Sequence, residues 1–171
     1  MSDNLFRIPL TKGLFAIVDE WNFDWVNQFN WCAQTTKRTD THAVYAARRV
    51  GPRILLLHRE ILRAGPGQEV DHKNRDTLDC REGNLRLATG SQNSANKGKA
   101  SGCSSRFKGV CFVPQLNSTN PWLAYFGGSG KAGAPVKRKY LGYFVTEEIA
   151  AAAYNSAALG AWGEFAVLNK I

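Results

Sequence analysis

The pattern of hydrophobic and polar residues predicts a succession of short strands and helices. Two strand-like runs, residues 43–49 and 53–57, flank Val50-Gly51-Pro52 and predict a β-hairpin. A short helix over residues 58–64 should follow, because a Gly-Pro-Gly turn signal comes directly after it. Before the hairpin, residues 5–31 hold seven Trp and Phe side chains. These rings are enough to form a small core, so we expect them to be structural.

The next segment predicts the order strand, long loop, strand, helix. Val70-Asp71-His72 forms a short strand leading into a polar loop that ends at Asn84, and residues 85–88 form the second strand. Thr89 and Gln92 have the spacing of a capping box, so a helix should start at Thr89. This order can bring polar side chains of the first strand and of the helix to one spot.

Residues 97–105 are small, polar and basic, which is the composition of a flexible linker. We therefore expect two domains on either side of this linker. The first is residues 1–96, with its core at residues 54–96, and the second is residues 106–171.

The C-terminal part predicts a small sheet and one helix. Strand-like runs are found at residues 107–113, 122–126 and 136–144. Thr146 should cap an Ala-rich helix that reaches about Gly160. Strand alternation places Trp122, Ala124 and Phe126 beneath that helix. The predicted fold class is α+β: an aromatic-rich, β-containing N-terminal region, a strand–loop–strand–helix core, and a three-stranded antiparallel sheet with one helix.

The composition is that of a globular protein, with 171 residues, 44% hydrophobic and 21% charged. Its apolar stretches are shorter than the roughly 18 to 20 residues of a membrane helix, so no membrane partner is expected. No secretory signal is visible, which makes the cytoplasm the expected location. The four cysteines form no Cys-x-x-Cys pair, so we expect free thiols.

The net charge of +8 is concentrated in the middle of the chain. Residues 37–108 hold 15 basic and 7 acidic residues, whereas residues 1–36 carry a net −2 and residues 109–171 a net +2. Such a concentration suggests a polyanionic partner, most commonly nucleic acid. A solvated basic surface explains the charge equally well, so the charge leaves both interpretations open.

Asp71, His72, Asn84 and Asn93 are the residues that suggest a specific chemistry. Hydrolysis of a phosphodiester needs a base and a divalent cation. A neutral imidazole suits the first task, and carboxylate and amide oxygens suit a Mg²⁺ ion. Asn84 could hold the imidazole in its working tautomer. Nearby cations that could bind adjacent phosphates are Lys73, Arg75 and Arg86.

Each of these residues taken singly is better explained as structural, since an Asp-His pair or a lone His is common. The joint pattern is more specific. In order along the chain it consists of Leu57-His58-Arg59, Val70-Asp71-His72, Asp79-Cys80-Arg81-Glu82-Gly83-Asn84-Leu85-Arg86-Leu87-Ala88-Thr89 and Gln92-Asn93-Ser94-Ala95-Asn96-Lys97. This set resembles the HNH endonucleases of phages and introns. The resemblance implies a ββα-metal fold around one divalent ion.

Carried over by position, the resemblance implies that His72 is the general base and that Asp71 and Asn93 bind the metal, while Asn84 orients the histidine. An Asn in the last position, where the family name has a His, favours Mg²⁺ or Mn²⁺. The Cys pairs that hold a structural zinc in many family members are missing, so no structural zinc is expected. His58 is expected to be structural or to bind phosphate rather than to be catalytic.

The C-terminal part carries a second resemblance. Its motifs are Phe107-Lys108-Gly109-Val110, Trp122-Leu123-Ala124-Tyr125-Phe126, Tyr140-Leu141-Gly142-Tyr143-Phe144 and Glu148-Ile149-Ala150-Ala151-Ala152-Ala153-Tyr154 through Leu168-Asn169. They resemble the APETALA/ethylene-response-factor domain, which lays its sheet into the DNA major groove. The DNA contacts implied are Lys108, Tyr125, Arg138 and Tyr140. Basic residues of the plant family are replaced at Cys111, Val113 and Gly127, so we expect loose sequence preference. Lys137 to Lys139 is also explained as a solvated edge strand.

The function predicted from these observations is a metal-dependent HNH endonuclease of homing type that acts on double-stranded DNA, in the host cytoplasm if it is phage-encoded. No obligate protein partner is evident. The alternative is a non-catalytic DNA-binding transcriptional regulator with a degenerate nuclease core, which the intact set of four residues disfavours. A ribosomal-type RNA-binding protein would explain the charge but not those residues.

Overall fold

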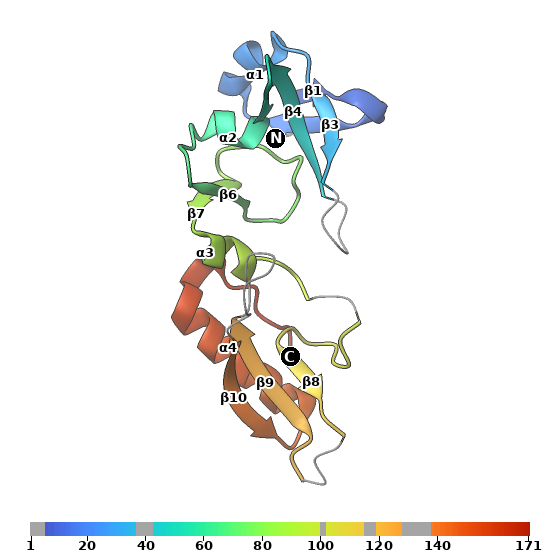
Figure 1. Ribbon diagram of the computed structural model, residues 1–171, viewed down its shortest axis with the longest axis vertical. Coiled ribbons are helices and arrows are strands. Elements are labelled where there is room, and N and C mark those ends of the chain that lie inside the picture. The colour runs from blue at the N-terminus through green and yellow to red at the C-terminus, as the bar shows by residue number, and fades with distance from the viewer. Residues whose placement is uncertain (1–5, 37–42, 100–101, 115–118, 128–137) are drawn as a thin grey trace, which may run out of the picture. The chain divides into compact units, whose positions relative to one another are not determined.

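The computed structural model describes residues 6–36, 43–99, 102–114, 119–127 and 138–171 (Figure 1). The chain divides into two compact units, Met1–Thr89 and Gly90–Ile171. Each unit has its own hydrophobic core. Both combine helices with small antiparallel sheets, as expected for the α+β class.

The first unit begins with a two-stranded sheet and a helix. β1 (Phe6–Pro9) pairs antiparallel with β2 (Phe15–Val18) across the 3-10 turn η1 (Thr11–Gly13), and α1 (Glu20–Asn27) follows. Buried and more exposed positions alternate along both strands. This alternation places one face of the sheet on the core, because successive strand side chains point to opposite faces.

A three-stranded sheet comes next in the first unit. It contains β3 (Cys32–Thr35), β4 (Val44–Val50) and β5 (Arg53–Leu56) in that order, and α2 (Leu57–Ile61) leads on from β5. The predicted hairpin is confirmed as β4 and β5. Its turn contains Gly51 at φ +56, a backbone conformation that glycine adopts without steric cost. The helix ends sooner than the sequence pattern predicted.

The remaining part of the first unit is a hairpin with a long loop. β6 (Glu69–His72) pairs antiparallel with β7 (Leu85–Ala88), which confirms the predicted order strand, loop, strand. Two backbone hydrogen bonds fasten the loop to β2: Ile17 donates to the Leu78 carbonyl, and Cys80 donates to the Ile17 carbonyl, each at 2.8 Å. The loop is therefore part of the folded unit.

The core of the first unit draws apolar side chains from most of its elements. Among its buried members are Ile8, Val18, Val26, Trp31, Leu57, Val70, Cys80 and Leu85. The predicted aromatic core is only partly right: Trp31 is 4% exposed, but Trp21 is 69% exposed and donates to the Glu82 carboxylate. All four cysteines are free, as predicted, and burial raises the pKa of the Cys80 thiol to about 12.

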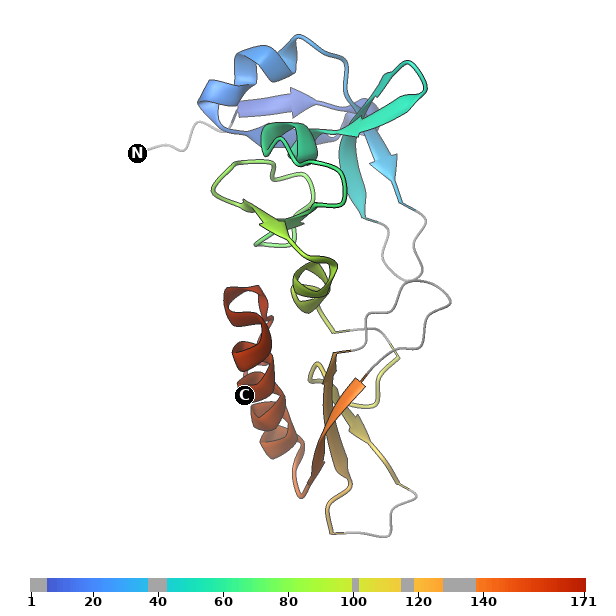
Figure 2. The ribbon, with the colours of Figure 1, turned by 60° about the vertical axis from the view of Figure 1, so that its left-hand side comes forward.

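The second unit places one long helix on a three-stranded sheet (Figure 2). Its elements are α3 (Gly90–Ala95), β8 (Val110–Phe112), β9 (Trp122–Gly127), β10 (Arg138–Phe144), α4 (Glu147–Trp162) and η2 (Gly163–Phe165). The sheet order is β10-β9-β8, antiparallel throughout. Thr146 caps α4 as predicted, because its side-chain oxygen accepts from the Ile149 amide at 3.3 Å. The start of the predicted strand 136–144 lies outside the described residues.

Small side chains let α4 lie close to its sheet. Ala124 of β9 and Ala150 of α4 are both fully buried in the core of the second unit. Gly109 has φ +74, and a Cβ there would come within 2.1 Å of the Tyr154 ring. The prediction that Ala124 faces the helix is therefore confirmed, and Gly109 is required by both conformation and space. Within the described ranges, no helix has the length and apolarity needed to cross a membrane.

The division between the units falls before the predicted linker at residues 97–105. α3 belongs to the second unit, where the Ala95 carbonyl accepts from Lys108 Nζ at 2.6 Å. Ser105 lies inside the predicted linker but is 2% exposed, and its hydroxyl donates to the Glu147 carboxylate at 2.7 Å. These long-range bonds make the end of the segment part of the C-terminal fold, which its small and polar composition did not reveal.

Candidate active site

His72 ends β6 inside the first unit. It is 5% exposed, and its neighbours Val70 and Asp71 are also buried, so the end of the strand is covered on both faces. Burial lowers the pKa of His72 below the ordinary 6.5, against an opposite effect of the Asp71, Asp76 and Asp79 carboxylates. The imidazole is therefore neutral at pH 7, which is the form that accepts a proton.

Two more rings surround His72. The His58 ring lies edge to face with it, with centroids 5.0 Å apart, and the Tyr45 ring lies 6.2 Å from His72 and 5.2 Å from His58. His58 is 5% exposed, and burial lowers its pKa to about 3. The sequence predicted that His58, in the motif Leu57-His58-Arg59, is structural or binds phosphate rather than being catalytic. It did not predict that the ring lies against His72.

Asp71 forms a buried ion pair with Arg86. The two residues are cross-strand partners in β6 and β7, and Nε of Arg86 donates to Oδ2 of Asp71 at 2.8 Å. The side chains are only 10% and 4% exposed for Arg86 and Asp71. The guanidinium of Arg86 binds this carboxylate because the strand register sets the two side chains opposite each other. The contact of Arg86 with phosphate stays a prediction.

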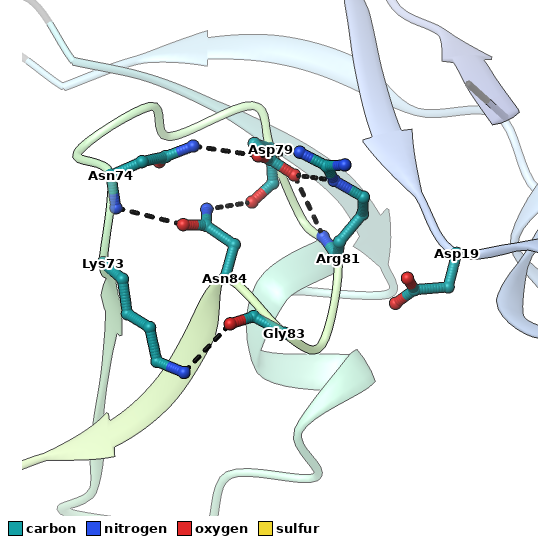
Figure 3. Close-up of a pocket in the computed structure, with 7 residues that line it drawn as sticks. All are labelled: Asp19, Lys73, Asn74, Asp79, Arg81, Gly83 and Asn84. Carbon is teal, nitrogen blue, oxygen red and sulfur yellow. Dashed lines mark hydrogen bonds and ion pairs between the residues drawn. The ribbon is translucent and has the colours of Figure 1, made fainter. Parts of the chain in front are cut away.

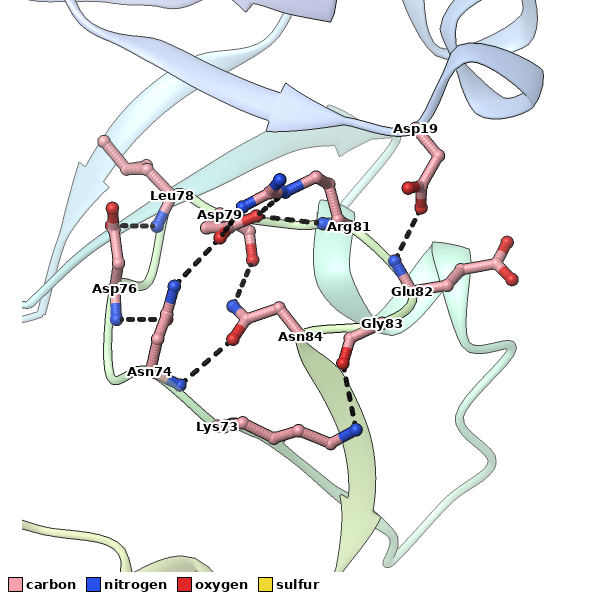
Figure 4. Close-up of polar contacts among 10 residues, drawn as sticks. All are labelled: Asp19, Lys73, Asn74, Asp76, Leu78, Asp79, Arg81, Glu82, Gly83 and Asn84. Carbon is pink, nitrogen blue, oxygen red and sulfur yellow. Dashed lines mark hydrogen bonds and ion pairs between the residues drawn. The ribbon is translucent and has the colours of Figure 1, made fainter. Parts of the chain in front are cut away.

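Asn84 holds the loop between β6 and β7 (Figure 4). Its side-chain oxygen accepts from the Asn74 amide at 3.0 Å, and its side-chain nitrogen donates to the Asp79 carbonyl at 2.8 Å. Its backbone carbonyl accepts from the amide of Lys73 at 2.8 Å. Asn84 thus fixes the chain that directly follows His72, and its role in orienting the histidine stays a prediction.

Asp79 is the centre of this loop and was missed by sequence reasoning. Arg81 binds both carboxylate oxygens at 2.8 Å, and the Asn74 side chain donates to Oδ2 at 2.9 Å (Figure 4). The hydrogen bonds from Arg81 are the largest cause that lowers the pKa of Asp79, which is 2% exposed. The sequence signal that could have identified Asp79 is the motif Asp79-Cys80-Arg81, which places its cationic partner two residues away.

Replacing Asp79 with Asn is expected to lower the free energy of unfolding by about 2 to 3 kcal/mol, because the variant loses charge-assisted hydrogen bonds at a buried site. Urea denaturation followed by circular dichroism measures this change. Asp76→Asn is the matched control, since Asp76 is exposed in the same loop and its side chain accepts from the Leu78 amide.

The pH dependence gives a second check on Asp79. A depressed folded-state pKa means that the stabilisation is present above the ordinary value of 3.8 and is lost as the pH falls through the folded-state pKa. The stability difference between the wild type and Asp79→Asn should therefore shrink in acid. A difference that stays constant down to pH 2 would contradict the assigned role.

A pocket of about 610 Å³ opens beside the loop (Figure 3). It is lined by Asp19, Lys73, Asn74, Asp79, Arg81, Gly83 and Asn84. Lys73 donates to the Gly83 carbonyl at 2.9 Å across this space. Lys73 and Arg75 are exposed, as contacts to phosphate require, and Arg75 has φ +67 in the loop. The pocket lining includes Asn84 but not Asp71 or His72, so it lies next to the candidate histidine rather than around it.

The predicted metal ligands fall in different units. Asp71 is on β6 of the first unit, and Asn93 is on α3 of the second. Over the part of the chain that the structure describes, there is no group of three or more His, Cys, Asp or Glu side chains placed to hold a metal. The predicted donors are one carboxylate and one amide oxygen, which fit a hard ion that keeps several waters. The convergence of Asp71 and Asn93 stays a prediction.

Three predicted DNA contacts lie together on the sheet of the second unit. Tyr125 and Tyr140 are cross-strand partners in β9 and β10, and the Arg138 guanidinium lies 4.7 Å from the centre of the Tyr125 ring. Tyr140 is 65% exposed. The buried Ala124 points to the opposite face, toward α4. The three side chains therefore form one basic and aromatic surface, which we call the sheet surface.

Lys108, the fourth predicted DNA contact, has a different environment. Its ammonium donates to the carbonyls of Ala95 and Lys97 at 2.6 Å each. These carbonyls lie at the last residue of α3 and two residues beyond it, where backbone oxygens lack helical partners and a cation is favourable. In the structure Lys108 therefore serves as a C-terminal cap for α3.

Comparison with protein families matches residues 64–95 to the model of the HNH endonuclease family. Comparison with curated proteins and with solved structures gives no significant match. The matched segment contains β6, the loop, β7 and α3, and with them Asp71, His72, Asn84 and Asn93. This central segment, rather than the N-terminal or C-terminal parts of the chain, is what is similar to HNH endonucleases.

Proposed function

We propose that this chain is a metal-dependent DNA endonuclease of the HNH homing type, which hydrolyses phosphodiester bonds in double-stranded DNA. The observation that carries the proposal is His72, buried and neutral beside Asp71, within the segment that matches the HNH endonuclease family. A neutral imidazole at the edge of a polyanion site is the group that can take a proton from water at pH 7.

In this proposal His72 accepts a proton from a water molecule, which attacks the phosphorus atom of the scissile phosphate. Asn84 and Asp79 keep the following loop in place, and thereby the end of β6 that carries His72. Lys73 and Arg75, both exposed at the start of that loop, bind neighbouring phosphates. The products carry 5′-phosphate and 3′-hydroxyl ends.

Asp71 and Asn93 would hold the divalent cation, Mg²⁺ or Mn²⁺. When bound, the ion neutralises charge on the phosphate and on the departing oxygen. Asp71 also pairs with Arg86, whose guanidinium orients the carboxylate in a buried position. Oxygen donors of this kind suit Mg²⁺ better than softer ions.

The sheet surface of the second unit would add DNA affinity, in the manner of an ethylene-response-factor-like domain. Arg138 supplies charge, and exposed aromatic rings such as Tyr140 supply contact area. The middle of the chain, residues 37–108, contributes the larger positive charge. Since phosphate contacts carry no sequence information by themselves, we propose loose sequence preference.

The Arg138→Gln variant is expected to bind duplex DNA more weakly on all sequences and to show a smaller salt dependence. Loss of one phosphate contact should lower the slope of log affinity against log salt by about one. Fluorescence anisotropy at several salt concentrations measures this slope. Lys170→Gln is the matched control, because it removes the same charge from an exposed position outside the sheet. Equal slopes for both variants would count against the sheet surface as a DNA contact.

Incubation of the protein with supercoiled plasmid tests the proposed function. We expect nicked or linear plasmid with Mg²⁺ and intact plasmid when EDTA is added, because the reaction depends on the divalent ion. A gel shift that leaves the plasmid intact with every metal tried would instead support a non-catalytic DNA-binding regulator. End-labelling of the products then checks for 5′-phosphate and 3′-hydroxyl ends.

A further inference from the structure

Three aromatic rings meet inside the first unit, and each comes from a different element. Tyr45 lies on β4, His58 on α2 and His72 on β6. All three pairs of ring centroids lie between 5.0 and 6.2 Å. Segments that are distant in sequence thus bring two imidazoles and one phenol together, and two of the three rings have no part in the mechanism proposed above.

We propose that His58 is a positioning residue for His72, whose imidazole it holds in one orientation by packing ring against ring, with Tyr45 as the second wall. The inference rests on the proposed function, in which His72 is the general base. It adds a residue that touches neither the DNA nor the metal and that acts only through His72.

The contact between the two histidines is a packing contact. Their rings are inclined at 69°, which is the edge-to-face geometry that aromatic pairs prefer. Nδ1 of His58 is buried and has no hydrogen-bond partner among the residues that the structure describes. No hydrogen bond from the described residues holds the ring at that atom, and the rings of Tyr45 and His72 pack against it.

The backbone beneath His58 is held firmly enough for this task. α2 packs Leu57 and Ile61 into the core, at 0% and 8% exposed. The next residue, Arg59, donates to the carbonyls of Ala64, Gly65 and Gln68 at 2.6 to 3.3 Å. These bonds tie the turn that connects α2 to β6, so the ring of His58 is set at a fixed place relative to the strand that carries His72.

The charge state of His58 also suits a positioning role. Burial is the largest cause that lowers its pKa to about 3, so the ring is neutral near pH 7. A neutral ring adds no positive charge beside a base that must itself be neutral to accept a proton. Small errors in the placement of a reacting group can lower a rate as much as a hundredfold, so a rigid wall beside the base has catalytic value.

Two substitutions separate ring positioning from simple filling of space. His58→Leu keeps an apolar side chain in the core but removes the flat ring, and we expect kcat for plasmid nicking to fall about 10- to 100-fold with KM unchanged. His58→Phe restores an aromatic edge, and we expect it to recover kcat to within about threefold of the wild type. Ile61→Ala, which weakens the same helix away from the rings, is the control for loss of stability.

The alternatives give different results in the same experiment. If His58 only fills space, His58→Leu and His58→Phe should both cleave as fast as the wild type. If His58 reacts itself, neither variant should cleave. If His58→Leu acts through lost stability, kcat should fall for Ile61→Ala as well, and the melting temperatures of the variants should fall in parallel with kcat. Each of these three outcomes overturns the proposal.

A second measurement does not depend on cleavage. The chain has three histidines, so protein labelled only at histidine gives three sets of imidazole NMR signals, and His58 variants leave those of His42 and His72. We expect the His72 signals to shift and broaden in His58→Leu and to stay sharp in His58→Phe. Unchanged His72 signals in His58→Leu would overturn the positioning role. If the wild type proved unable to cleave DNA, the proposed function would fail, and these signals would still decide the packing of His72.

Discussion

The His72→Ala variant is expected to bind DNA as the wild type does and to lose cleavage by about 10²- to 10⁴-fold, which is the usual contribution of a general base. The reason is local: His72 is the neutral, buried imidazole at the end of β6, next to Asp71. Its removal takes away the proton acceptor but none of the exposed cations that bind phosphate. Single-turnover nicking of plasmid in Mg²⁺ and anisotropy binding on the same DNA measure the two properties separately.

Glu69→Gln is the control for His72→Ala, because Glu69 lies on the same strand but is exposed. It should cleave at the rate of the wild type. Thermal unfolding of both variants establishes that each remains folded at the assay temperature. Cleavage by His72→Ala at the rate of the wild type would show that His72 is not the general base.

The Asp71→Leu variant is expected to lose about 3 to 5 kcal/mol of folding free energy, because it leaves the Arg86 guanidinium in a mostly buried position without its counter-charge. Cleavage should be lost as well, since Asp71 is a proposed metal ligand. These two losses have different causes, and a single variant does not separate them. Urea denaturation gives the stability, and plasmid nicking with Mg²⁺ gives the activity.

The double variant Asp71→Leu with Arg86→Met separates the two causes. Replacing both members of a buried ion pair by apolar residues of similar size is often neutral or stabilising, so most of the stability should return. Cleavage should not return, because the metal ligand is still missing. Recovery of cleavage together with stability would show that Asp71 serves only as the partner of Arg86.

Sequence reasoning succeeded where short-range patterns decide the structure. The β4–β5 hairpin, the β6–loop–β7 hairpin and the Thr146 cap all depend on residues close together in the chain. Turn signals, strand alternation and capping spacings report these interactions directly. Residues 64–95 also carried their family resemblance in linear order, which the family comparison supports.

Sequence reasoning did not foresee the intramolecular partners of residues whose partners lie far away in the chain. Lys108 was assigned to DNA, yet its ammonium caps α3 at the Ala95 carbonyl. Arg86 was assigned to phosphate, yet it is paired with Asp71. In both cases the positive charge suggested a phosphate ligand. The partners in the structure are a buried carboxylate for Arg86 and a helix end for Lys108, and only three-dimensional proximity identifies them.

By itself, the sequence determined the order of the strands and α-helices from β4 onward, the α+β class and the identity of the polar residues in the central segment, because these follow from local periodicity and from residue type. Only the tertiary structure decided which groups meet. It set His58 and Tyr45 against His72, and it made Asp79 the centre of the loop. The physical reason is that burial, ion pairing and ring packing depend on distances between segments that are remote in the chain, and residue type alone does not encode those distances.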